Sequence, residues 1–265
     1  DLPTRHPAGL GQATAYLGTP VWSDAGNVTL AAAAGLYFDG QLQADGGATQ
    51  AEGGTLTLLG LGRLSGQPGA PQASGVLIQQ SGLLLPQGAL ADGAIDSAAP
   101  AGVLRFAVDR LAGSGIATLA IGPDPSQNGT SDLPLAVPLG FAGDVNLSLG
   151  RAFIANTPAI QALPAGATSM SAVANGYAGG NGQVSIEAPY VNLTGGVVPT
   201  AAPVAMAGDG KLSVQADFID IGGWLNLQRW AEADFESAAD IRFQAPALLA
   251  YANGSGLSPD RMFGV

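Results

Sequence analysis

The sequence predicts an all-β fold in which the chain coils, so that each short strand stacks on the strand one turn earlier. Three observations predict it. The 265 residues include 40 Gly and 18 Pro, and only 11% are charged, which is typical of many short strands joined by tight turns. Apolar and polar residues alternate in short bursts, which is the periodicity of strands rather than of helices. In residues 210–243 the bursts follow one another too closely for an ordinary sandwich, so they favour a solenoid.

The bursts in residues 210–243 show the pattern most clearly. Each consists of one polar residue with an apolar residue before it and another after it. The apolar pairs are Leu212/Val214, Ile219/Ile221, Leu225/Leu227, Ala233/Phe235 and Ile241/Phe243. The polar residues between them are Ser213, Asp220, Asn226, Asp234 and Arg242. Since successive side chains of a strand point to opposite faces, each burst predicts one buried face and one face in solvent.

Other parts of the chain carry weaker bursts of the same kind. They predict strands in residues 27–31, 36–43, 54–60, 75–80, 103–108, 115–122, 144–155 and 183–193. Segments without a period, rich in Pro, Gly, Ala and Ser, predict long loops inserted at the corners of the coil, in residues 62–74, 86–102, 123–142, 157–180 and 195–209.

An internal repeat supports the coil. Residues 182–196 align with residues 210–223 if a difference of one residue at the corner is allowed, as stacked coils of similar sequence would. We therefore expect an irregular lead-in or cap over residues 1–25 and a parallel β-helix over residues 26–245. Residues 246–265 are expected to form a C-terminal tail or to start a further segment.

Composition excludes several classes of function. A net charge of -11 with nine basic residues leaves no basic patch for a phosphate backbone, so nucleic acid is not an expected partner. No apolar run reaches the ~20 residues that span a bilayer. The chain has no Cys and one His, His6, which excludes disulfides, thiolate metal sites and sites that need several histidines. The sequence thus predicts no catalytic residues, no metal and no cofactor.

The densest acidic group offers one candidate for chemistry. Glu232, Asp234 and Glu236 are two residues apart, so on a strand they point outward on the same side. A pair of carboxylates serves as acid and base in polysaccharide hydrolysis when the two groups are about 5 to 9 Å apart. The alternative, which we favour, is a solvated face opposite Ala233 and Phe235.

Two tryptophans lie beside the acidic row. Trp224 and Trp230 are six residues apart, so a strand through both would place them on one outer face, opposite Leu225 and Leu227. Outward aromatic rings stack on sugars or on a neighbouring subunit. The alternative is that both are corner residues packed under a loop. We keep Trp224, Trp230 and the acidic row as a candidate binding surface.

Several phrases of the sequence resemble the filamentous haemagglutinin family, the large exoproteins of two-partner secretion in Gram-negative bacteria. They are VLIQQSG (76–82), GQVSIEAPYVNL (182–193), GKLSVQADFIDIGG (210–223) and FESAADIRF (235–243). The resemblance covers residues 100–245 well and the first hundred residues loosely. It implies a right-handed parallel β-helix (solenoid), here with several long loop insertions. The Asn-Pro motifs of the family's secretion domain are absent from these 265 residues.

The resemblance implies a structural and adhesive role without catalysis, in a segment of a large secreted or cell-surface exoprotein. An outer-membrane secretion partner is then expected, and the receptor is left open between a host cell, a bacterial cell and a carbohydrate. Two alternatives share the architecture. One is a β-helical polysaccharide-active hydrolase or lyase that uses outward carboxylates, and the other is an extracellular filament protein that associates end to end.

Overall fold

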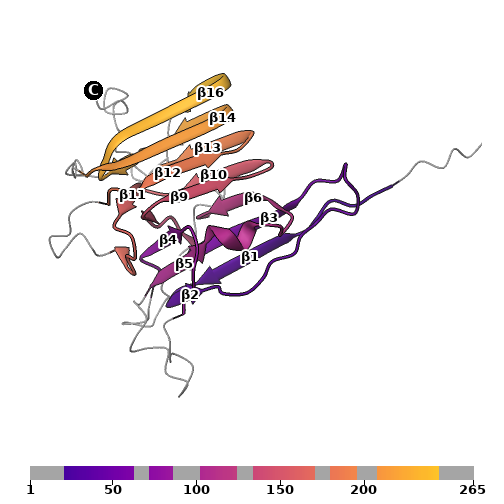
Figure 1. Cartoon of the computed structure of the whole chain (residues 1–265), viewed down its shortest axis with the longest axis horizontal. Helices are drawn as coiled ribbons and strands as arrows, with labels where there is room; N and C mark the ends of the chain where they lie inside the picture. Colours follow the sequence, from indigo (N-terminus) through magenta and orange to yellow (C-terminus); the bar gives the residue numbers. More distant parts are fainter. Residues whose placement is uncertain are drawn as a thin grey trace, which may run out of the picture.

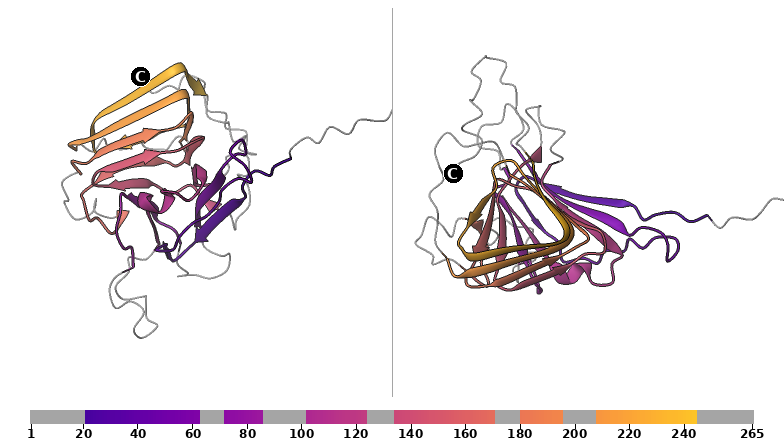
Figure 2. Two further views of the ribbon diagram at one scale, coloured as in Figure 1. Left: turned by 45° about the vertical axis from the view of Figure 1, so that its right-hand side comes forward. Right: turned by 90° about the horizontal axis from the view of Figure 1, so that it is seen from above.

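The computed structural model describes residues 21–62, 72–85, 102–123, 134–170, 180–195 and 208–244. This part of the chain is nearly all β, as predicted. Its strands form two sheets that curl around a common core, and they lie one above another in a stack (Figure 1). Seen along the stack, the strands trace a three-sided outline (Figure 2). Within the described residues every strand pair but one is parallel.

The strands and their neighbours follow from the pairing. The larger sheet has the order β1 (Asn27–Ala32), β3 (Gly54–Leu61), β6 (Ile116–Ile121), β10 (Ala152–Asn156), β13 (Tyr190–Thr194), β14 (Gly210–Gly222), β12 (Gln183–Glu187) and β9 (Val145–Ser148), with β16 (Trp230–Gln244) on β14 and β7 (Pro134–Leu135) antiparallel to β3. The smaller sheet has the order β15 (Asn226–Gln228), β11 (Ala159–Leu163), β8 (Leu139–Ala142), β4 (Gly75–Gln79), β5 (Val103–Ala107) and β2 (Gly35–Tyr37). A 3-10 helix, η2 (Val108–Leu111), follows β5.

The long strand β14 divides the larger sheet into two arms. Its first half pairs with β12 and its second half with β13. We call β9, β12 and the first halves of β14 and β16 the first arm. The second arm comprises β1, β3, β6, β10, β13 and the second halves of β14 and β16. The two arms and the smaller sheet are the three sides of the outline.

Columns of apolar side chains run through the stack. In the second arm one column consists of Val28, Leu56, Leu119, Phe153, Val191, Ile219 and Ile241. The next inward position gives Leu30, Leu58, Ile121, Ala155, Leu193, Ile221 and Phe243. The smaller sheet faces them with Leu36, Leu104, Val76, Leu139, Ile160 and Leu227. The middle members are fully buried, so the core continues from one coil to the next.

The bursts predicted in residues 210–243 are confirmed, with one change. They occupy three strands rather than five, because β14 and β16 bend at the corner without ending. The predicted gap in the repeat is wrong: Gln183 lies opposite Lys211 and Thr194 opposite Gly222, so the offset is constant. A shift of register occurs instead where β16 passes this corner, between Ala216 and Phe218 of β14.

Two predicted loops are wrong, because they contain strands. Residues 123–142 include β8 and residues 157–180 include β11, and every residue of both strands is buried. The smaller sheet is covered on both faces. A second cluster of Leu77, Val103, Ala142, Leu163 and Met170 packs on the face away from the main core. A strand buried on both faces shows no alternation. The strand predicted in residues 36–43 is limited to β2.

The strand β5 lies out of sequence order. It sits between β2 and β4 in the smaller sheet, although it follows β4 in the chain. After β5 the chain passes η2 and then stacks β6 on β3 in the second arm. From there the strands of each side follow in sequence order, and in the smaller sheet β11 pairs directly with β15. The first coils are therefore held by an inserted strand.

The turn after η2 contains a glycine, Gly113, whose backbone conformation is expected to contribute to stability. Gly113 has φ of 67°, and a Cβ added to it would meet no atom within 4 Å. Replacing Gly113 by Ala is expected to cost about 1 to 2 kcal/mol of unfolding free energy, from left-handed backbone strain alone. Gly26 is equally open and has no positive φ, so Gly26→Ala is the matched control. Equal losses in chemical denaturation would contradict the strain argument.

The predicted domain boundaries stay predictions. Residues 1–20 of the expected lead-in and the expected tail, residues 246–265, lie outside the described residues. Residues 21–26 of the described part contain no regular element before β1. In the portions that the structure describes, no helix has the length and apolar character to cross a bilayer.

Candidate functional site

The outer face of the first arm carries rows of polar side chains in register. The central row is Asn146, Ser185, Ser213 and Asp234, one residue from each of four neighbouring strands. A row on one side contains Gln183, Lys211 and Glu232, and a row on the other contains Ser148, Glu187, Gln215 and Glu236. We call this surface the polar face. Its rows arise because the alternating residues Val184, Leu212 and Ala233 point inward.

Two open grooves follow the polar face. One, of about 560 Å³, is lined by residues that include Asp144, Asn146, Ser213, Glu232 and Asp234. The other, of about 510 Å³, follows the corner between the two arms, with Glu187, Pro189, Asp217 and Glu236 among its lining residues. Both have the size of small-molecule sites. The predicted acidic row is thus divided, with two carboxylates in the face groove and one in the corner groove.

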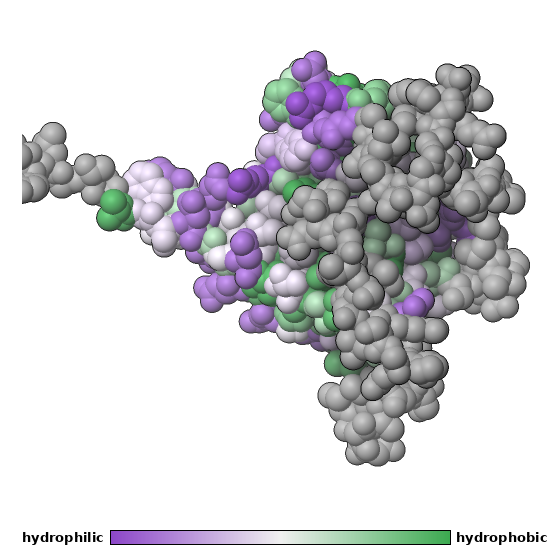
Figure 3. All heavy atoms as spheres, turned by 180° about the vertical axis from the view of Figure 1, so that it is seen from behind, coloured by the Kyte–Doolittle hydropathy of each residue, from purple (hydrophilic) through white to green (hydrophobic). Residues whose placement is uncertain are grey.

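The outward position of Glu232, Asp234 and Glu236 is confirmed. All three are exposed, while Ala233 and Phe235 pack against the core. Seen from behind, hydrophilic residues gather at the top of the molecule, which is the β16 end in Figure 1 (Figure 3).

The acidic row has one direct basic partner in the described residues. Lys211 Nζ lies 2.8 Å from Glu232 Oε2. The hydrogen bond from Lys211 and the charge of Lys211 lower the pKa of Glu232. The same hydrogen bond and the charge of Glu232 raise the pKa of Lys211. Gln215 Nε2 donates to Glu236 Oε2 at 3.4 Å. A general acid at neutral pH needs a raised pKa, whereas the pKa of Glu232 is lowered.

The polar face offers hydrogen-bonding groups at regular intervals. Neighbouring strands place equivalent side chains about 4.8 Å apart, and alternate residues of one strand about 7 Å apart. Hydroxyl, amide and carboxylate groups at such intervals can bind the hydroxyl groups of an extended ligand. Within the described ranges no group of three or more His, Cys, Asp or Glu side chains is arranged to hold a metal ion.

Of the two interpretations of the tryptophans, the outward position is wrong for Trp230, which packs inward after a corner. This side chain packs against the main core beside Phe141, at 6.4 Å between ring centroids, and its Nε1 donates to Ile160 O at 3.0 Å. The reason is that β15 ends at Gln228 and Arg229 takes φ of 66°, so the alternation does not continue. Trp224 lies between β14 and β15 and is half-buried. The two tryptophans do not form a shared platform with the acidic row.

One polar network on the second arm was not predicted. Asp220, expected on a solvent face, is 3% exposed. Tyr190 Oη donates to Asp220 Oδ2 at 2.7 Å, and Arg242 Nε and Nη2 donate to its two oxygens at 2.6 and 2.8 Å. Burial alone would raise the pKa of Asp220, but the hydrogen bonds from Arg242 and Tyr190 together with the Arg242 charge lower it. Asn192, Asp220 and Arg242 occupy equivalent positions on neighbouring strands. This alignment is the feature of the sequence from which the network could have been predicted.

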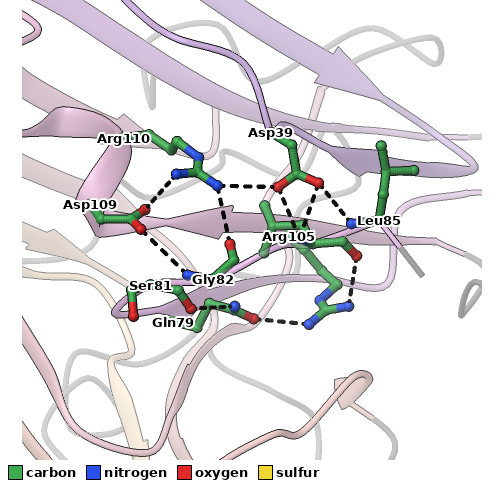
Figure 4. A network of polar contacts seen from close by, with 9 residues as sticks. Asp39, Gln79, Ser81, Gly82, Leu85, Arg105, Asp109 and Arg110 are labelled. Carbon is green, nitrogen blue, oxygen red and sulfur yellow. Dashed lines mark hydrogen bonds and ion pairs between the residues drawn. The ribbon is translucent and has the colours of Figure 1, made fainter. Parts of the chain in front are cut away.

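A second unpredicted network surrounds the inserted strand β5 (Figure 4). Arg105 of β5 is 8% exposed. Its Nη1 donates to Leu84 O at 3.1 Å and its Nη2 to Gln79 Oε1 at 2.9 Å, while its guanidinium lies 6.0 Å from the ring centroid of Tyr37. Burial lowers the pKa of Arg105, and the charges of Tyr37 and Asp39 oppose that shift in part.

Asp39 completes this network and holds the segment after β4. Its carboxylate accepts the backbone N–H groups of Leu84 and Leu85, both at 2.9 Å, and it lies 3.5 Å from Arg110 Nη2. Arg110 also lies 3.3 Å from Asp109 and donates to Gly82 O at 3.2 Å. These contacts hold residues 82–85 against β5 and η2, although Arg105 Nε and Arg110 Nε are buried without a hydrogen-bond partner among the described residues.

Comparisons with protein-family models, with curated proteins and with solved structures found no match. The fold and the site define an all-β protein of stacked parallel strands with a regular polar face. Its function is therefore inferred from the stack, the polar face and the residues that the sequence brings to them.

Proposed function

We propose that this chain is a right-handed parallel β-helix and that it serves as a structural and adhesive segment of a large secreted bacterial exoprotein of the filamentous haemagglutinin type. The observation that carries the proposal is the set of apolar columns that run from Val28 and Leu30 of β1 to Ile241 and Phe243 of β16. The parallel pairing and the three sides of the outline support a helix of coils. General chirality of parallel crossover connections supports the right hand.

A stack of this kind suits a role in which length and surface matter. Each coil contacts its neighbours along the axis, so added coils lengthen the protein without a new core. Each coil adds hydroxyl, amide or charged side chains to the polar face at a regular spacing, which suits a repeating ligand such as a surface polysaccharide. The acidic balance of the chain, with a net charge of -11, favours a neutral or cationic ligand over a sulfated one.

Location and secretion belong to the same proposal. We place the chain outside a Gram-negative cell, secreted or on its surface, with an outer-membrane secretion partner. The phrases GQVSIEAPYVNL and GKLSVQADFIDIGG support this, since they occupy stacked strands β12, β13 and β14. A cell-surface or carbohydrate receptor would contact the polar face.

Adhesion can be tested with immobilised protein. Binding to a panel of polysaccharides and to bacterial and epithelial cells is expected, and Asn146→Ala with Ser185→Ala and Ser213→Ala is expected to reduce it. The matched control replaces Thr55 and Thr57, polar residues of a second-arm strand, by Ala. The adhesive role of the polar face is contradicted if the folded protein binds none of these surfaces. It is also contradicted if the triple variant binds as well as the Thr55/Thr57 control variant.

A polysaccharide-active enzyme is the second candidate, and the face groove beside Glu232 and Asp234 favours it. Incubation with the same polysaccharides distinguishes the two. New reducing ends or unsaturated products that disappear in Glu232→Gln/Asp234→Asn would support catalysis. Binding without product would support adhesion.

A further inference from the structure

In the described part of the chain, the stack ends in two strands, β1 and β16, that each have one unpaired edge. Among the residues that the structure describes, β16 pairs only with β14, and β1 pairs in parallel only with β3. The two strands lie at opposite ends of the molecule (Figure 1). An edge strand with free backbone groups is a template for pairing with another strand.

At the β16 end the apolar columns stop with side chains in solvent. Ile241 is 38% exposed and Phe243 is 78% exposed. Their counterparts one strand below, Ile219 and Ile221, are buried or packed against the core. The end of the stack therefore presents apolar side chains that point in the same direction as the core positions of the coils below.

At the opposite end the same columns begin with aliphatic side chains. Val28 and Leu30 of β1 are partly buried against the core. In the smaller sheet, Leu36 of β2 and Leu227 of β15 are the first and last members of one column. In the larger sheet the apolar positions at the two ends therefore match.

We propose that the β16 end binds the β1 end of a second copy of this chain, head to tail and with parallel strands. Val28 then lies over Ile241 and Leu30 over Phe243. The joint continues the larger sheet, and since the two surfaces differ, it can repeat and form an open filament.

Charge favours this pairing over the alternative. The outward residues of β1 are Asn27, Thr29 and Ala31, and none of them carries a charge to oppose Asp240 or Arg242 of β16. Pairing two β16 edges instead would place the acidic residues Glu232, Asp234, Glu236 and Asp240 against one another. Like charges on opposed strands are unfavourable. Two copies of β16 are therefore not expected to pair with each other, whereas β1 of a second copy can pair with β16.

The joint goes beyond the proposed function, because it concerns self-association and not adhesion. Its contact is limited to one strand of the larger sheet in each copy, so the association is expected to be weak. Loss of the joint would leave the adhesive role of the polar face untouched, and loss of adhesion would leave the joint untouched.

A disulfide between copies tests the register, since the natural chain has no Cys. Ala31 follows Leu30 and Gln244 follows Phe243, and both are exposed. In one molecule they are roughly 29 Å apart across the stack, too far for a disulfide. In the joint they lie opposite each other. Ala31→Cys/Gln244→Cys is therefore expected to form dimers and longer chains under mild oxidation.

The control pair is Ala31→Cys/Asp240→Cys, which uses the same strands but is displaced by about 13 Å along β16. It is expected to give no linked dimer beyond random collision. Equal linking of both pairs, or linking of neither, would overturn the proposal.

Sedimentation velocity of the cysteine-free protein gives a second measurement. Concentration-dependent association is expected, and Phe243→Asp is expected to abolish it. Leu83→Asp, which adds the same charge at a site that is 71% exposed and away from β16 in sequence, is the matched control and should still associate. The proposal would be overturned if the protein were a monomer at every concentration. If the β16 amides were then protected from hydrogen exchange, another segment of the same chain would be pairing with the free edge of β16.

Discussion

Replacing Phe153 by Ala is expected to lower the free energy of unfolding by about 3 to 5 kcal/mol. Phe153 is fully buried and lies at the middle of its column, between Leu119 and Val191. Its removal leaves a cavity inside the stack. The neighbouring coils cannot close the cavity, because the backbone hydrogen bonds fix their spacing. Urea denaturation followed by circular dichroism measures the loss.

The matched control is Ile154→Ala. Ile154 follows Phe153 on the same strand, faces outward and is only partly buried. A loss of less than about half that of Phe153→Ala is expected, since less apolar area leaves water on folding. If the two substitutions cost the same, the column does not form the core that the structure describes.

The sequence predicted strands best where one face meets solvent. In β3 buried residues alternate strictly with half-buried ones, and this alternation is visible in the sequence. The strands β8 and β11 are buried on both faces, so their sequences show no period and were predicted as loops. The two-sided burial of the smaller sheet depends on packing between distant segments, which single-sequence periodicity does not contain.

The candidate site was likewise predicted in part, where alternation along one strand decides the position of a side chain. The outward position of Glu232, Asp234 and Glu236 follows from alternation alone, and it is confirmed. The grooves beside them depend on which residues of the next strands lie in register, such as Lys211 opposite Glu232. The inward turn of Trp230 depends on the left-handed backbone at Arg229, a position that the sequence does not mark with Gly or Asn.

The network around β5 could not be predicted, because its members are far apart in the sequence. Asp39, Gln79, Arg105 and Arg110 come together only when β5 is inserted between β2 and β4. In the sequence they are isolated polar residues in separate segments. The stability of the insertion is therefore expected to depend on this network, which leads to the second large prediction.

Asp39→Ala is expected to lower the free energy of unfolding by about 2 to 4 kcal/mol. The substitution removes the acceptor of the Leu84 and Leu85 N–H groups and the partner of Arg110. Asp39→Asn keeps one carbonyl oxygen and is expected to lose less. The exposed Asp45 provides the control, since Asp45→Ala makes the same charge change. Equal losses at both positions would show that charge, rather than the hydrogen bonds of Asp39, sets the effect.

The pH dependence gives an independent check on the same residue. Burial would raise the pKa of Asp39, but the hydrogen bonds from Leu85, Leu84 and Arg110 lower it overall. The unfolded chain then binds more protons than the folded chain in acid, so the contribution of Asp39 is present above the ordinary Asp pKa and is lost as pH falls through its folded pKa. Asp220, whose pKa is also lowered, adds to this loss in the wild type. Asp39→Ala should therefore lose less stability than the wild type between neutral pH and the acid range, and parallel curves would contradict the role of its carboxylate.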